Sequence, residues 1–144
     1  MRKENVSKII IHCSATREGD NSINAEVIDR WHKKRGWKGI GYHFLVLIDG
    51  TIETGRMVDK CGANTKGLNC SSISICYVVG VESERDSKGK YPAKDTRTPE
   101  QIATMLELLR VLRKMYPEAK IHSHRDFAAK ACPSFDATTE YCNI

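Results

Sequence analysis

Residues 124–136 read HRDFAAKACPSFD, a segment in which a proline and several small residues surround one imidazole and one thiol. The spacing of His124 and Cys132 exceeds that of a ligand pair on a helix, so we expect a loop that curls back on one point. These side chains offer two of the three protein ligands that a catalytic zinc normally takes. The best candidate for the third is His12, which follows the apolar run Ile9–Ile11 near the other end of the chain. We therefore expect a fold that brings these distant segments together.

Three separated segments carry a family resemblance. They are HCSAT at 12–16, GYHF at 41–44 and the loop at 124–136, with WHK at 31–33 and GW at 36–37 between the first two. Together they resemble the zinc-dependent N-acetylmuramoyl-L-alanine amidases, above all the T7 lysozyme-like branch, and more distantly the peptidoglycan recognition proteins. The resemblance covers nearly the whole chain. It implies hydrolysis of the amide bond between N-acetylmuramic acid and L-alanine in peptidoglycan, as in an endolysin.

The same resemblance implies a set of site residues. One zinc ion per chain is expected on His12, His124 and Cys132, while Tyr42 and Lys130 match the catalytic tyrosine and lysine of the family. Such an ion polarises an amide carbonyl and lowers the pKa of water, and a cation or phenol beside it stabilises the charge that develops on the amide oxygen. Ordinary alternatives are a strand-end histidine bonded to the backbone, a solvated lysine and a tyrosine packed in the core.

The sequence departs from the family pattern at three positions. Asn64 stands where relatives carry histidine in the loop beside the substrate groove, and Ser74 and Val79 stand where their central strand has glycines. The first departure bears on substrate preference, and the other two bear on backbone approach and packing. None of them removes an expected metal ligand.

Two other functions fit parts of the sequence. A non-catalytic module of the same fold would bind peptidoglycan or regulate a polymerase, although binding alone needs no open metal site. A thiol protease would use Cys132 as the nucleophile with His124 as its base, and it would leave His12 without a role.

Composition and charge are those of an ordinary globular chain. Residues 1–144 are expected to form a single domain, and the net charge of +5 suits an anionic partner such as cell wall or nucleic acid, or simply a solvated surface. The basic start at 1–8 is followed by only three isoleucines, too few for a secretory signal, and no run approaches the length of a membrane span. We expect synthesis in the cytoplasm without a signal peptide, and action on the wall after release or on wall fragments in the cytosol.

The pattern of apolar residues predicts an α/β fold with a mixed central sheet flanked by helices. Polar, glycine-rich or charged loops are expected at 61–69 and 82–97, the second one exposed. Strands are expected at 8–13, 43–48, 51–55, 72–79 and 119–123, and helices at 25–35 and 98–116. Asp49-Gly50 predicts a hairpin between two of the strands, and Thr98-Pro99-Glu100-Gln101 predicts a helix start.

Two further expectations concern single side chains. His32 lies among lysines and an arginine on the polar side of the first helix, which predicts a surface position. The chain has six cysteines, of which Cys61 and Cys70 flank a glycine-rich loop and could pair. Because no export signal is encoded, they are expected to be free thiols.

Overall fold

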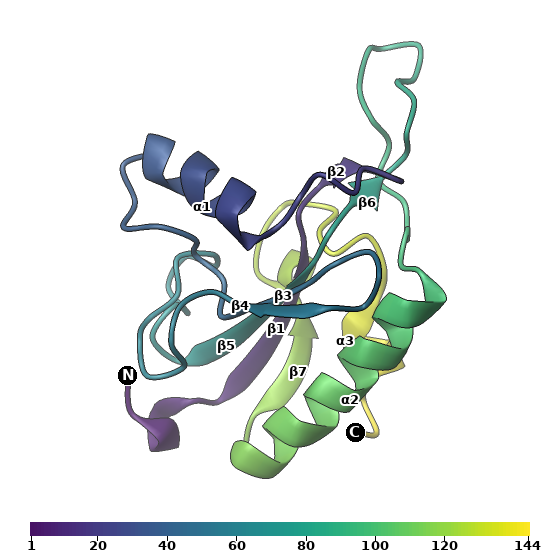
Figure 1. The fold of residues 1–144 in the computed structure, drawn as a ribbon. Coiled ribbons are helices and arrows are strands. Elements are labelled where there is room, and N and C mark those ends of the chain that lie inside the picture. The colour runs from purple at the N-terminus through teal and green to yellow at the C-terminus, as the bar shows by residue number, and fades with distance from the viewer.

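The computed structural model describes residues 1–144 and is built on a five-stranded sheet with the strand order β4-β3-β5-β1-β7 (Figure 1). Strand β1 is an interior strand that pairs in parallel with β5 on one side and with β7 on the other. The hairpin predicted at Asp49-Gly50 is confirmed, since β3 and β4 pair in antiparallel fashion. The strands are β1 (Lys8–Cys13), β3 (Phe44–Val46), β4 (Ile52–Thr54), β5 (Ser72–Tyr77) and β7 (Lys120–Ser123), with a separate parallel pair β2 (Thr16–Arg17) and β6 (Gly80–Val81).

The helices begin at the residues that the sequence marks as caps. Helix α1 (Ala25–Lys34) is capped by Asn24, whose side chain accepts from the backbone N–H of Val27. Helix α2 (Pro99–Met115) has the predicted capping box between Thr98 and Gln101. Helix α3 (Ala137–Glu140) and the short 3₁₀ turns η1 (Lys3–Asn5) and η2 (His124–Asp126) were not predicted. None of the helices has both the length and the apolar run that a bilayer crossing requires.

The two faces of the sheet are covered by different helices. Alternate residues of β1 and β5, such as Ile11 and Ile75, pack with Met105 and Leu109 of α2 in the larger apolar core. The opposite face carries a smaller core, in which Leu45 and Cys76 of the sheet join Ile28 of α1. On α2, Met105, Leu108, Leu109 and Leu112 are buried, whereas Ile102 and Met115 are exposed.

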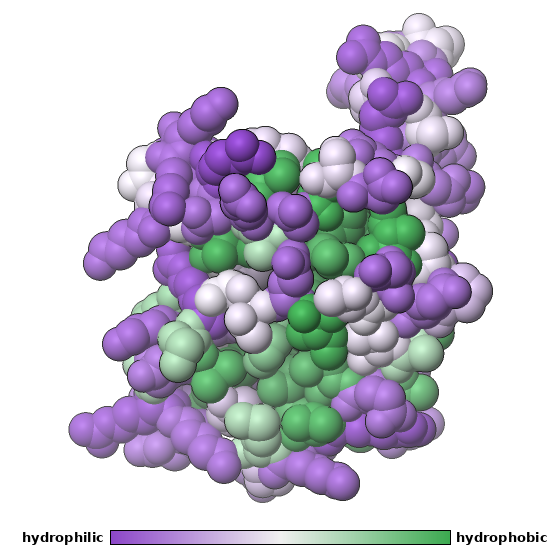
Figure 2. All heavy atoms as spheres, viewed as in Figure 1, coloured by the Kyte–Doolittle hydropathy of each residue, from purple (hydrophilic) through white to green (hydrophobic).

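Residues 82–95 project beyond the rest of the molecule, and Figure 2 shows that this projection is mostly hydrophilic. This confirms the predicted exposed loop for most of its length. The prediction is wrong at its end, because the Arg97 side chain is only 4% exposed.

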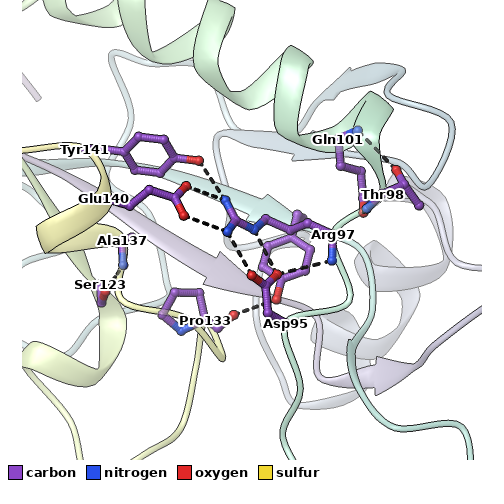
Figure 3. Close-up of polar contacts among 10 residues, drawn as sticks. Asp95, Arg97, Thr98, Gln101, Ser123, Pro133, Ala137, Glu140 and Tyr141 are labelled. Atoms are coloured by element: carbon purple, nitrogen blue, oxygen red, sulfur yellow. Dashed lines mark hydrogen bonds and ion pairs between the residues drawn. The ribbon is translucent and has the colours of Figure 1, made fainter.

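The buried guanidinium of Arg97 joins the base of the projection to the C-terminal segment (Figure 3). It donates hydrogen bonds to both carboxylate oxygens of Asp95 and of Glu140, and to the hydroxyl of Tyr141. A guanidinium that is satisfied in this way is stable when buried, because each of its polar edges meets an acceptor.

The prediction that Cys61 and Cys70 are free thiols is wrong. The loop between β4 and β5 turns back on itself and brings the two Cα atoms to 4.4 Å, and the sulfurs are joined in a disulfide. The prediction of free thiols rests on the lack of an export signal. The approach of the two cysteines instead depends on how the loop turns between its flanking strands, which the spacing in sequence does not indicate.

The surface position predicted for His32 is also wrong. Its side chain is buried, its Nδ1 atom accepts a hydrogen bond of 2.9 Å from the backbone N–H of Gly41, and its ring lies 4.6 Å from that of Trp37. The segment after α1 folds back over the last turn of the helix. It covers His32 on the side of the helix that the neighbouring lysines predict to be exposed.

Candidate active site

The three predicted metal donors meet at the carboxyl ends of β1 and β7. His12 lies near the end of β1, and His124 directly follows β7, whose residue Ser123 pairs with Ile11 of β1. Because the two strands are parallel, both histidines emerge at the same edge of the sheet, where ligands of open α/β sheets commonly bind. The loop after η2 then returns to place Cys132 beside them.

The donor atoms have the spacing of a small metal site. One donor atom from each of His12, His124 and Cys132 lies within 4.8 Å of the others, and the Sγ atom of Cys132 is 3.9 Å from Nδ1 of His12. Tetrahedral zinc with bonds of about 2.0–2.3 Å would hold its ligand atoms about 3.5 Å apart. The Nδ1 atom of His124 is buried and has no hydrogen-bond partner. The residues therefore fit a metal ion in both chemistry and spacing.

The charges around the site favour neutral imidazoles. Burial, then the neighbouring His124 and Lys130, lower the pKa of His12 well below its usual value, and burial and Lys130 lower the pKa of His124. Contact with the Cys13 thiol, together with burial, raises the pKa of Cys132. Binding of a cation would release that proton, because the thiolate is the form that ligates metals.

The loop that carries Cys132 is held by backbone and side-chain contacts. The backbone N–H of Cys13 donates to the Cys132 sulfur at 3.3 Å, and the backbone N–H of Arg125 donates to the Cys132 carbonyl at 2.8 Å. The Tyr77 hydroxyl donates to the Pro133 carbonyl at 2.6 Å, and the Ser134 hydroxyl donates to the carbonyl of Gly80 at 2.7 Å. These contacts hold the Cys132 sulfur beside His12.

The two predicted catalytic residues lie at the same site in different ways. The Tyr42 ring is 5.1 Å from the His12 ring, and burial raises the pKa of its phenol well above the usual value, so it stays protonated. Lys130 has an exposed side chain, and its charge reaches both imidazoles, whose pKa values it lowers. Neither residue is assigned a role by this placement alone.

Two residues at the site were not predicted to contribute to it. The Thr65 hydroxyl lies 3.4 Å from Nε2 of His12 and donates to Oδ1 of Asn64 at 3.1 Å. Asn64 also lies near enough to His12 for a side-chain hydrogen bond that acts to raise the pKa of the imidazole, against the larger effect of burial. In the sequence, Asn64 is identified only as a departure from the family pattern. Nothing in the single sequence indicates a role for Thr65.

Comparison with known proteins identifies the family. The family model described as N-acetylmuramoyl-L-alanine amidase matches residues 2–135. The chain belongs to this amidase family. Among its relatives, the endolysin of Escherichia phage T7 is 41% identical over 135 residues, which cover 94% of this chain and 85% of that protein. The endolysin of Enterobacteria phage K11 is 38% identical over the same coverage of both chains.

Solved structures agree with the amidase assignment. The N-acetylmuramoyl-L-alanine amidase LysC from Clostridium intestinale matches with a TM-score of 0.77 at 30% identity, covering 96% of this chain and 83% of that one. The peptidoglycan recognition protein SA of Apis mellifera matches with a TM-score of 0.75 at 24% identity, covering 96% of this chain and 82% of that one, a likeness of fold. The predicted mixed sheet with flanking helices is confirmed, and the chain is an enzyme of the amidase class.

The thiol protease alternative accounts poorly for the amidase site. It leaves His12 without a role, although donor atoms of His12, His124 and Cys132 all lie within 4.8 Å of one another.

Proposed function

We propose that this amidase cleaves the bond between N-acetylmuramic acid and L-alanine in peptidoglycan or its fragments, using one zinc ion held by His12, His124 and Cys132 in a domain formed by residues 1–144. The observation that carries the proposal is the partnerless Nδ1 atom of His124, buried beside the other two donors. A buried polar atom without a partner costs about 1–3 kcal/mol. A metal ligated at this atom would remove that cost.

Zinc bound at these residues would supply a Lewis acid and a water molecule of lowered pKa. The residues around it then have distinct tasks. Tyr42 keeps its proton, so its phenol is a donor that can orient the amide oxygen. Lys130 brings a positive charge to the mouth of the site, where it would stabilise the negative charge that develops on that oxygen.

A cavity of about 700 Å³ is a candidate for binding the peptide part of the substrate. Its lining includes Ile40 and Ala63, each two positions from a residue that contacts His12, Tyr42 and Thr65 respectively, but it contains none of the three metal donors. Lys38, Arg56 and Lys60 contribute three cations against the single carboxylate of Asp29. This balance suits the carboxylates of a stem peptide better than an uncharged ligand.

The metal assignment is tested by zinc analysis and by hydrolysis of purified peptidoglycan. We expect one zinc per chain in the wild type, loss of zinc and of hydrolysis in Cys132→Ser, and retention of both in the control Cys142→Ser, which changes an exposed free thiol. A chelator should abolish hydrolysis and added zinc should restore it. Undiminished hydrolysis by Cys132→Ser without bound zinc would overturn the proposal.

The roles of Lys130 and Tyr42 are tested separately from metal binding. Lys130→Ala and Tyr42→Phe should each lower kcat about 100- to 1000-fold while zinc content stays unchanged. Lys88→Ala, a lysine on the exposed projection, is the control and should leave kcat unchanged. A kcat within threefold of the wild type in either site variant would remove that residue from the proposed machinery.

A further inference from the structure

A continuous chain of hydrogen bonds lies behind His12, on the side away from Cys132. The Oγ1 atom of Thr65 is 3.4 Å from Nε2 of His12 and 3.1 Å from Oδ1 of Asn64. The Nδ2 atom of Asn64 in turn donates to the Gly41 carbonyl at 2.8 Å and to the Ser74 hydroxyl oxygen at 2.9 Å. Every member is half-buried or buried, so each bond is protected from water.

The far end of this chain fixes the direction of its bonds. The carbonyl of Lys60 can only accept, so Nε2 of His43, at 2.8 Å, must carry a proton. The Nδ1 atom of His43 is then an acceptor, and it receives the backbone N–H of Ser74 at 3.1 Å. The same Nδ1 lies 3.0 Å from the Ser74 hydroxyl, which directs its proton there and leaves its oxygen free to accept.

The near end follows from the same accounting. Because Nδ2 of Asn64 donates to a carbonyl, its Oδ1 is the atom that faces Thr65 and must accept. The Thr65 hydroxyl has one proton, and it goes to Asn64. The oxygen of Thr65 is left as an acceptor for Nε2–H of His12. The other ring nitrogen, Nδ1, then carries the lone pair, and this is the atom that faces Cys132 at 3.9 Å.

The loop that carries Thr65 is built to hold it still. The disulfide between Cys61 and Cys70 closes the loop, and the Oδ1 atom of Asn69 accepts from the backbone N–H groups of both Asn64 and Thr65 at 2.9 Å. Side chains anchored at both ends of a short closed loop lose little entropy when they hold a neighbour in place.

We infer that Thr65 is a positioning residue of the metal site: its hydroxyl holds His12 in the Nε2–H tautomer and so keeps Nδ1 free to bind the ion. The inference rests on the proposed zinc site. Groups that orient a ligating imidazole typically contribute about 10- to 100-fold to metal affinity. Thr65 touches neither the ion nor the amide bond in this arrangement, and it acts through His12.

The first test is the zinc affinity of the purified protein, measured by competition with a chromophoric chelator. Thr65→Val keeps the shape and removes the hydroxyl, and it should weaken zinc binding about 10- to 100-fold. Thr65→Ser keeps the hydroxyl and should bind within threefold of the wild type. The matched control is Thr104→Val. Thr104 lies on helix α2, away from the site, and its hydroxyl donates to the carbonyl of Gly50. This variant should bind zinc as the wild type does.

The second test needs no metal. In the metal-free protein labelled with ¹⁵N at histidine, the ring shifts of His12 should report the Nε2–H tautomer, and Thr65→Val should shift the population toward Nδ1–H. Thermal unfolding of the metal-free variants separates a folding defect from a site defect. If the wild type binds no zinc, the proposed function fails. If the wild type binds zinc and Thr65→Val matches it in affinity and tautomer, the positioning role alone is overturned.

Discussion

The guanidinium carbon of Arg97 lies 3.4 Å from the centre of the Phe135 ring. Phe135 belongs to the loop that carries Cys132, and Arg97 also binds Glu140 of α3 and Asp95 at the base of the projection (Figure 3). One buried cation therefore joins the base of the projection to two elements of the C-terminal segment. Its planar fork is required, because two carboxylates and a ring face are met at once.

Replacing Arg97 should destabilise the fold strongly. Arg97→Ala should lower the free energy of unfolding by about 3 kcal/mol, since it breaks a buried ion network and a cation–π contact. Arg97→Lys should recover less than half of this loss, because an ammonium cannot bind both carboxylates in the same plane. Urea unfolding measures both, with Arg110→Ala, which breaks an exposed pair with Glu107, as a control that should change by less than about 0.5 kcal/mol. Equal stability of Arg97→Lys and the wild type would contradict the requirement for the fork.

The Arg97–Glu140 pair should make stability depend on acid pH. Hydrogen bonds from Arg97 lower the pKa of Glu140 in the folded protein. A carboxyl with a lowered folded pKa stabilises the fold above its unfolded pKa of about 4.3, and this contribution is lost as pH falls through the folded value. Glu140→Gln should therefore cost about 1 kcal/mol at pH 7, a modest figure because the side chain is 42% exposed, and the difference from wild type should shrink toward pH 3. A pH-independent difference in urea unfolding would refute this.

His32 should add a second pH dependence nearer neutrality. Burial lowers its pKa, so the unfolded chain takes up a proton at a higher pH than the folded one. The stability linked to His32 is thus full above the unfolded pKa of about 6.5 and declines as pH falls below it, by at most about 1.4 kcal/mol per pH unit. His32→Asn keeps an acceptor for the Gly41 N–H and cannot titrate. In the metal-free protein, its stability should fall less steeply from pH 7 to pH 5 than that of the wild type, and parallel curves would count against the idea.

The disulfide should stabilise the protein through its short loop. Cys61 and Cys70 are separated by nine positions, and closing a loop of this length contributes about 2–3 kcal/mol in the chain-entropy account. The double variant Cys61→Ser/Cys70→Ser should lose this amount in urea unfolding, while Cys142→Ser should lose nothing measurable. Reduction of the wild type should produce the same loss as the double variant. An unchanged midpoint after complete reduction would show that the bond adds no stability.

Local chemistry made much of the fold predictable. The helix start at Thr98 and the turn at Asp49-Gly50 depend on near neighbours in sequence, and both predictions are confirmed. The three donor residues could be named because the segments that carry them resemble the amidase family, and the structure places the three side chains together.

The remaining features depend on how distant segments fold back on one another. His32 is covered by the segment that follows α1, and Arg97 meets partners more than forty positions away, at Glu140 and Tyr141. Asn64 and Ser74, two separate departures from the family pattern, contact each other directly at 2.9 Å. A single sequence shows such departures one at a time, so their relationship appears only in three dimensions.

The separation of His12 from Cys132 by 120 positions has a consequence for biosynthesis. A nascent polypeptide still held on the ribosome with its last loop in the exit tunnel has only the first of the proposed donors in place. Such a chain would be catalytically silent however well its early strands had formed. Hydrolytic capacity would thus arise abruptly, once residues 124–132 have emerged and reached β1, and products cut short before them would lack two of the three proposed donors.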